Sequence, residues 1–314
     1  MASETTLTPP ALAILSRNFI VDAATTEIVG RAVGGASPPV TVRVECNGAF
    51  AGAPKVGEDG RWALAVPLSV GDNTITVTAT NQAGYETVAE VLVMRLVTDR
   101  TQADAARVKQ LSAKDWAKMT DAERLEWLYG YADDILRWRD GEVLSCTDGV
   151  LYFYAEEGSH KGAYNDVDMA RVEEAAGYLS DLLIDLPVAL REYAESIGVA
   201  WDADYDVPYD PDKYGIETKT DWAVTDIPDK AQLDRYLGNV ALLASAIVLE
   251  SALPDSMNNL TYSDANAIEA ALIALNDSIG KLQRQREEQL ENVRKSFRRS
   301  GQFTFWSGTL PLPV

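Results

Sequence analysis

Hydrophobic and polar residues alternate with a period of two between residues 18 and 97. The apolar positions are Val40, Val42, Val44 and Cys46, then Trp62, Leu64, Val66 and Leu68, then Ile75, Val77 and Ala79. Such alternation is typical of antiparallel strands with one buried face. The Asp59-Gly60 pair before Trp62 favours a type I′ hairpin turn, in which both central residues need positive φ. We therefore predict a β-sandwich of about seven short strands over residues 18–97.

The period becomes helical after residue 98, and the best-marked helix is expected to start at Asn165. Asn165 and Asp168 have the spacing of a capping box, in which each side chain accepts a hydrogen bond from the other residue's backbone N–H. One apolar face then recurs at intervals of three and four residues: Met169, Val172, Ala176, Leu179, Leu183 and Leu186. Because proline interrupts helices, we expect Pro187 to start a separate segment, Val188 to Ile197, that ends at Gly198.

The same pattern returns near the C-terminus. Thr261 and Asp264 form a second capping box, and aligning Thr261 with Asn165 places Glu269 on Glu173. The apolar face of this helix is Ile268, Leu272, Leu275, Ile279 and Leu282. We expect the helix to continue to about Arg299, with its first half packed inside the subunit and its basic second half projecting. The alternative is that Gly280 or Gly301 lets the tail fold back on its own bundle. A further helix is expected from Asp229, capped by Gln232.

Residues 131–160 interrupt the helical pattern. The turn pairs Asp140-Gly141 and Asp148-Gly149 flank two apolar runs, 142–146 and 150–155, which predict a small inserted β-hairpin or meander. The expected fold class is thus multidomain α and β, with a β-sandwich followed by a mainly α-helical domain. Its expected parts are an arm at 1–17, the sandwich at 18–97, the helical domain at 98–283, and a basic helix extension with a C-terminal strand or tail at 284–314.

Charge and composition narrow the classes of partner. The chain of 314 residues has 48 acidic and 28 basic side chains, a formal net charge of −20, which disfavours nucleic acid as a partner. No apolar run is long enough to span a membrane, and the N-terminus lacks the pattern of a signal peptide. Cys46 and Cys146 fall in different expected domains, so we expect no disulfide framework. We expect a protein made in the cytoplasm and not inserted into a membrane.

Three strand segments carry a resemblance to a known module. They are residues 39–44, Pro-Val-Thr-Val-Arg-Val, residues 58–68, Glu-Asp-Gly-Arg-Trp-Ala-Leu-Ala-Val-Pro-Leu, and the Thr-rich strand with its turn at 71–84. Together they resemble bacterial immunoglobulin-like repeats, which occur in surface proteins and in bacteriophage virion proteins. The resemblance implies an immunoglobulin-like sandwich and leaves its ligand open, because such sandwiches serve many functions.

Four pieces of the helical half resemble a family of structural proteins encoded by phages and prophages of Gram-positive bacteria. They are residues 98–109 with 119–128, residues 161–173, residues 219–222 with the helix at 236–240, and residues 257–269. The resemblance covers most of residues 98–280 in consistent order. It implies a virion component, most often of the tail, and brings no catalytic residues. The chain departs from the family pattern at 131–160 and in the basic stretch after Leu282.

Candidate reactive and metal-binding residues are few. The only histidine, His160, falls in an expected loop, so neither a nucleophile–histidine pair nor a zinc site is indicated. An acidic run resembles the front of a calcium loop: Asp202, Asp204, Asp206 and Asp210. It has Val207 where the loop needs glycine and Lys213 where it needs glutamate. We expect an acidic connector there, with calcium binding as the alternative, and predict no metal, no cofactor and no enzymatic activity.

Two sets of residues are candidates for interaction. Trp138, Tyr152 and Tyr154 lie in the insertion, where aromatic side chains favour recognition. The basic end of the last helix and the segment after it suit a docking surface for an acidic neighbour or another copy of the chain: Arg294, Arg298, Arg299, Phe303, Phe305 and Trp306. The alternative for the basic residues is an ordinary solvated helix face. Expected partners are other copies of the chain, other virion proteins, and a host cell-surface glycan or protein.

These observations lead to one functional hypothesis and two alternatives. The hypothesis is a non-enzymatic structural component of a bacteriophage tail, in the tail-tip or baseplate region, located in the virion. Its immunoglobulin-like domain would then be an exposed accessory or binding module. The first alternative is a capsid or neck decoration protein. The second, from another class, is a bacterial surface adhesin or carbohydrate-binding protein.

Overall fold

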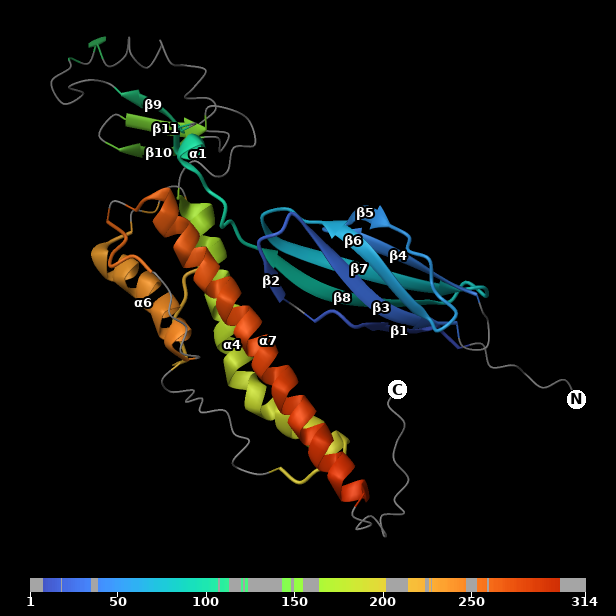
Figure 1. Cartoon of the computed structure of the whole chain (residues 1–314). Coiled ribbons are helices and arrows are strands. Elements are labelled where there is room, and N and C mark those ends of the chain that lie inside the picture. The colour runs from blue at the N-terminus through green and yellow to red at the C-terminus, as the bar shows by residue number, and fades with distance from the viewer. Residues whose placement is uncertain are drawn as a thin grey trace, which may run out of the picture.

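The computed structural model shows β-sheets in the N-terminal part of the chain and long helices in the C-terminal part (Figure 1). It describes residues 8–17, 19–34, 39–106, 108–112, 120, 122–123, 143–147, 150–154, 164–201, 214–223, 226, 228–246, 253–258 and 260–299. For residues 105–106, 108–112, 143–147, 150–154 and 297–299 the description is limited to the backbone.

The N-terminal part consists of two facing sheets. One has the strand order β1-β3-β6, formed by Ala11–Ile14, Thr25–Val33 and Arg61–Pro67. The other has the order β2-β8-β7-β4-β5, formed by Phe19–Val21, Glu86–Arg95, Gly71–Asn81, Val40–Cys46 and Ala49–Gly52. Strand β2 pairs with β8 in parallel, and the other pairs are antiparallel. Both sheets contribute to one core, which includes Ile28, Val44, Trp62, Ile75 and Val93.

The alternation seen in the sequence is confirmed in these strands. Val42 and Val44 in β4, Trp62 and Val66 in β6, and the apolar positions of β7 are buried. Two details differ. The run Ala11–Ile14, expected to belong to an N-terminal arm, is strand β1, because it pairs with β3.

The second difference is the turn type. The turn with positive φ at both central residues is Asn47-Gly48, between β4 and β5. At Asp59-Gly60 only the glycine has positive φ, 80°, so the type I′ prediction there was wrong. Asparagine is one of the few residue types besides glycine that adopt the left-handed conformation. The Asn47 side chain is held in place by β7, because its oxygen accepts from Thr74 N at 2.8 Å.

In the described residues from 164 to 299, three long helices form the C-terminal body. They are α4, Asp166–Ser196, α6, Lys230–Ala246, and α7, Tyr262–Arg299. All three expected starts are confirmed by their caps. Asn165 and Asp168 exchange the hydrogen bonds of a capping box, as do Thr261 and Asp264. At α6 the side chains of Asp229 and Gln232 bond each other's backbone N–H.

Pro187 lies inside α4 and does not begin a new segment, so that prediction was wrong. The buried face continues through it, with Leu186, Leu190 and Ala194 all at or below 2% exposure. Burial of this face outweighs the missing N–H of the proline. The helix ends at Ser196, close to the expected position, with Ile197 as its C-cap and Gly198 following with φ of 70°.

The expected small sheet is present but has an additional strand. Strands β10, Val143–Thr147, and β11, Val150–Tyr154, form the antiparallel hairpin. The third strand, β9, Val108–Ser112, pairs with β11 and comes from a segment expected to be helical. A short helix α1, Gln102–Ala106, precedes β9. The sheet has the order β10-β11-β9 and lies near the start of α4 (Figure 1).

Sheets and helices share a hydrophobic core. Ile20 of β2, Met94 of β8 and Leu96 belong to the cluster that is otherwise built from α4, α6 and α7. Beyond the sandwich, α4 and α7 continue side by side as a parallel pair, with the start of each near the start of the other (Figure 1). Leu290 of α7 is 1% exposed and packs with Ala194 and Val199. The second half of α7, expected to project alone, is therefore covered on one face by α4.

Candidate functional site

Four buried charged side chains meet where the sandwich joins the helices. This ionic cluster consists of Arg100, Asp168, Arg171 and Glu269, none of which exposes more than 4% of its side chain. Arg100 Nη2 lies 2.9 Å from Asp168 Oδ1 and 2.6 Å from Glu269 Oε1. Arg171 Nη2 lies 2.7 Å from Glu269 Oε1 and also binds Asp168. Two positive and two negative groups thus neutralise one another away from water.

The ionic cluster also binds the backbone that leaves the sandwich. Val97 N donates to Glu269 Oε2 at 2.6 Å, and Arg100 Nη1 donates to Val97 O at 2.5 Å. Asn266 accepts from Arg100 N at 3.0 Å and donates to Arg100 O at 2.8 Å. The connector after β8 is therefore fixed by side chains of α7, and the sandwich is attached by more than its covalent link.

Local electrostatics keep both arginines charged. Burial alone lowers the pKa of the Arg171 guanidinium, but attraction and hydrogen bonding from Glu269, together with Asp168, raise it overall. The same balance, again led by Glu269, raises the pKa of Arg100. An arginine with a raised pKa stays protonated near neutral pH and is unsuited to proton transfer. The ionic cluster is therefore a structural element.

A second buried carboxylate, Glu173 of α4, has a similar environment. Its Oε2 accepts from Lys219 N at 2.6 Å, and both of its oxygens accept from Arg235, at 2.9 and 2.7 Å. The indole N–H of Trp222 lies 3.4 Å from Oε1. This Glu173 cluster joins α4, α6 and the extended segment before α6.

A pair of tyrosines lies beside the ionic cluster. The hydroxyls of Tyr164 and Tyr236 are hydrogen-bonded, and their rings meet edge to face with centroids 6.5 Å apart. The Arg100 guanidinium lies 5.4 Å from the centre of the Tyr164 ring. Burial raises the pKa of Tyr164, and the Glu269 carboxylate raises it further. Neither hydroxyl is therefore poised to act as a base.

Among the described residues, two surface grooves lie along the parallel pair formed by α4 and α7. The interdomain groove, of about 750 Å³, lies between residues 15–21 and the two helices. Its walls include Phe19 and Val21, Leu182 of α4, and Gly280 of α7. Asn276 of α7 and Ile20 also line the groove, and Asn276 donates to Ile20 O at 3.5 Å. The groove is partly apolar and is open to solvent.

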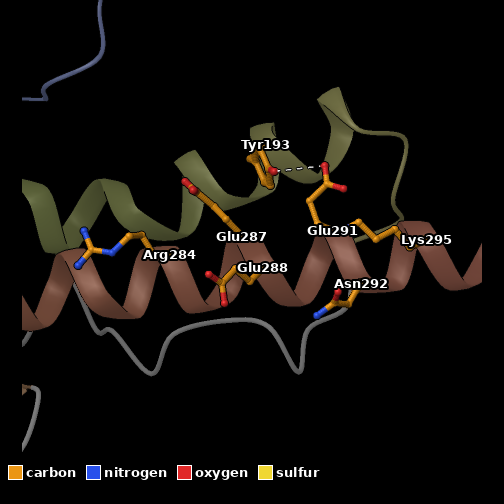
Figure 2. Close-up of a pocket in the computed structure, with 7 residues that line it drawn as sticks. All are labelled: Tyr193, Arg284, Glu287, Glu288, Glu291, Asn292 and Lys295. Atoms are coloured by element: carbon orange, nitrogen blue, oxygen red, sulfur yellow. Dashed lines mark hydrogen bonds between the residues drawn. The ribbon is translucent and has the colours of Figure 1, made fainter. Parts of the chain in front are cut away.

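The distal groove, of about 500 Å³, lies near the ends of the two helices (Figure 2). Figure 2 shows the carboxylates of Glu287, Glu288 and Glu291 between Arg284 and Lys295, with Tyr193 on α4. Tyr193 donates to Glu291 Oε1 at 3.5 Å. Burial raises the pKa of Tyr193, and Glu291 and Glu287 raise it further. This groove is polar, shallow and mixed in charge.

The candidate residues from the sequence are distributed as follows. Arg294 is in α7, where it pairs with Glu291 at 3.0 Å. Tyr152 and Tyr154 are in β11, and Arg298 and Arg299 end α7, but their side chains are outside the described part of the structure. The remaining candidates lie outside the described residues: Trp138, Asp202, Asp204, Asp206, Asp210, Phe303, Phe305 and Trp306.

Sequence reasoning did not identify the buried clusters. Arg100, Arg171 and Arg235 resemble ordinary surface residues of a charged chain, because nothing in a single sequence reveals their partners far away. The sequence contained one sign that Glu173 and Glu269 have similar roles, because aligning the two capping boxes placed Glu269 on Glu173. Among the described residues there is no group of three or more potential metal ligands, and no helix long and apolar enough to cross a membrane.

No protein-family model matches the chain, and no curated protein matches it. Solved structures with a similar part include the fibronectin(III)-like modules of Clostridium thermocellum CbhA, with 13% identity over 28% of this chain and 46% of that chain, and a TM-score of 0.25. The N-terminal Ig1-2 module of the Drosophila receptor protein tyrosine phosphatase DLAR has 15% identity over 49% of this chain and 87% of that chain, and a TM-score of 0.26.

A third similar structure is the Bacteroides ovatus SGBP-B in complex with a mixed-linkage heptasaccharide, with 15% identity over 34% of this chain and 32% of that chain, and a TM-score of 0.23. The chain thus spans less than half the length of the CbhA and SGBP-B chains. Similarity at this level carries no functional argument.

Proposed function

We propose that this protein is a non-enzymatic structural component of a bacteriophage virion, most specifically of the tail. The observation that carries the proposal is where the family-like residues lie. All four pieces that resemble phage structural proteins contribute to the buried clusters: Arg100 from the first, Asp168, Arg171 and Glu173 from the second, Lys219, Trp222 and Tyr236 from the third, and Asn266 and Glu269 from the fourth.

This distribution favours a scaffold over an enzyme. The residues behind the resemblance hold connectors against helices. The charged ones at the centre of the clusters are buried and charge-compensated: Arg100, Asp168, Arg171, Glu173 and Glu269. An enzyme family would instead retain a recognisable set of accessible reactive groups around a pocket. A rigid junction is what a particle component needs if the immunoglobulin-like module is to be presented at a fixed angle.

Purified particles test the proposal directly. Particles of the phage or prophage that encodes the chain should contain it in a fixed stoichiometric ratio to the major tail protein, as measured by quantitative peptide mass spectrometry. Immunogold electron microscopy with an antibody to the sandwich should label the tail. Label on the capsid or neck would favour a decoration protein, and label on uninfected cells with none on particles would favour an adhesin.

The purified protein should show no turnover of peptidoglycan or host polysaccharide. A low activity from a contaminant would persist when individual carboxylates are replaced. Turnover that is abolished by replacing a single Asp or Glu would contradict the non-enzymatic role.

A further inference from the structure

The interdomain groove presents apolar surface that no described residue covers. Leu15 at its edge is 55% exposed, and Phe19, Val21 and Leu182 are only partly buried. Gly280 lies in its wall, where an added Cβ would meet nothing closer than Arg284 Nη1 at 3.6 Å. The volume of about 750 Å³ falls within the range of about 300–1,000 Å³ that ligand pockets usually have. There is therefore space for several side chains.

The rim of the groove is charged and can open. Arg17 and Glu287 form an ion pair of 3.2 Å across one end, and the Arg17 side chain is 66% exposed. Exposed pairs of this kind contribute little to stability, because water and salt screen them. The pair does not prevent a chain segment from entering, and the polar rim would orient its backbone.

The sequence supplies an apolar segment of matching character. Residues 300–314 contain no charged side chain and include Phe303, Phe305 and Trp306. An aromatic side chain buries about 150–250 Å² when it packs, which makes such residues strong anchors in an interface. This segment directly follows Arg299, the last residue of α7.

We propose that the interdomain groove of one copy binds the Phe303–Trp306 segment of a second copy. The inference deepens the proposed function, and it rests on that function in expecting several copies of the chain in one assembly. Chain length favours a second copy over the same one. Gly280 precedes Arg299 by 19 residues of α7, or about 29 Å at ~1.5 Å per residue. Trp306 follows Arg299 by seven residues, which span at most about 25 Å when fully extended.

The chain would also use part of that length to reverse direction after the helix. Its own aromatic residues therefore reach no further than the near rim at Glu287, which is 12 residues before the helix end. A segment from a second copy has no such limit. Reciprocal exchange of two segments would give a closed dimer, and one-way exchange around a ring would give a larger symmetric assembly.

Mixing two full-length variants tests the inference. The segment variant carries Phe305→Ala and Trp306→Ala, and the groove variant carries Ala189→Arg and Gly280→Arg, both in the groove wall. Val188→Arg is the matched control, because Val188 is 54% exposed on α4 and does not line the groove. Ala189→Arg alone is a milder groove variant in case the pair does not fold. Circular dichroism verifies the fold of each protein.

Sedimentation velocity over a range of concentrations provides the readout. The wild type and Val188→Arg should associate equally, whereas the segment and groove variants should each remain monomeric at the same concentration. An equimolar mixture of the two variants should regain association, more weakly than the wild type, because one intact segment still meets one intact groove.

Three results would overturn the inference. They are a wild type that is monomeric throughout, folded groove variants that associate normally, and a mixture that stays monomeric although the wild type associates. The last result would indicate binding within one chain. Only purified protein is used, so these outcomes are independent of whether the chain is found in phage particles.

Discussion

Glu173 and Glu269 occupy equivalent positions in two different helices and have matching environments. Each lies eight residues beyond its N-cap, Asn165 in one case and Thr261 in the other. The two glutamates are 2% and 0% exposed. Each accepts a backbone N–H at 2.6 Å from an extended segment, Lys219 in one case and Val97 in the other.

Arginines complete both environments. Arg235 binds Glu173 with two hydrogen bonds, and Arg100 and Arg171 bind Glu269. Two helices with the same local sequence pattern thus hold two different connectors by the same means. The carboxylate satisfies a buried backbone donor that would otherwise be costly, and the arginine neutralises the carboxylate.

The first prediction is that Glu269→Gln destabilises the protein by about 3–5 kcal/mol, because removing one member of a buried ion pair leaves the other uncompensated. Arg100 and Arg171 would then share only Asp168. Glu173→Gln should cost less, since the Arg235 side chain is 25% exposed and water can solvate it. Urea denaturation followed by circular dichroism measures both changes.

Glu288→Gln is the matched control, because Glu288 is exposed on the same helix as Glu269. Its effect should stay within about 0.5 kcal/mol. If Glu269→Gln were as mild as Glu288→Gln, the ionic cluster would not stabilise the junction.

The sequence predicted those features that depend on neighbours along the chain. Capping at Asn165, Asp229 and Thr261 depends on residues three positions away, and strand alternation depends on residues two positions away. Both signals are local, and the structure has both. The stop of α4 at Gly198 is local in the same sense.

The remaining features depend on contacts across the fold. Pro187 stays inside α4 because the buried face beyond it packs against α7, which its own neighbourhood does not reveal. Strand β9 forms because β11 offers it an edge. Arg100 is buried because carboxylates 68 and 169 residues away surround it. A single sequence contains no direct sign of these partners.

The second prediction concerns Trp62, which is 3% exposed in the sandwich core. Trp62→Ala should cost about 3–5 kcal/mol. Gly30→Ala should also destabilise the sandwich, because the new Cβ would lie 2.2 Å from Trp62 Cζ2 and 2.8 Å from Ala13 O. Gly30→Ala should cost less stability in the Trp62→Ala variant than in the wild type. The clash with the indole is then gone, and only the close approach to Ala13 O remains. Thermal unfolding of all four proteins gives the coupling energy.

Gly177→Ala provides a control of opposite sign. A Cβ at Gly177 in α4 meets nothing closer than Thr218 Oγ1 at 3.7 Å, so alanine should raise stability by about 0.5–1 kcal/mol. If the stability costs of Trp62→Ala and Gly30→Ala were simply additive, the coupling energy would be zero. Glycine at position 30 would then not be needed for the packing of the Trp62 indole.

The third prediction is that Pro187→Ala stabilises α4. Proline in a helix interior is about 3 kcal/mol less favourable than alanine, so this is the upper limit of the gain. Val188→Ala, at the exposed neighbouring position, should change stability much less. Urea denaturation provides the comparison. A loss of stability in Pro187→Ala would show that the packing of Leu190 and Ala194 needs the geometry that proline imposes.

The fourth prediction is a pH dependence that arises from Glu174 of α4 and Asp72 of β7. Burial raises the pKa of Glu174, and the Asp72 carboxylate raises it further; burial also raises the pKa of Asp72. A carboxyl group whose pKa is higher in the folded than in the unfolded state opposes folding once it is ionised. This penalty is fully present above the folded pKa and disappears as the pH falls through it to the unfolded value, about 4.3 for glutamate.

Glu174→Gln should therefore be more stable than the wild type at pH 7, and the two should converge near pH 4. Asp181→Asn, an exposed carboxylate on the same helix, controls for the general loss of one negative charge from a chain of net charge −20. Urea midpoints at both pH values measure the difference. If Glu174→Gln were less stable than the wild type at pH 7, Glu174 would be held by a favourable contact that outweighs its burial and the repulsion from Asp72.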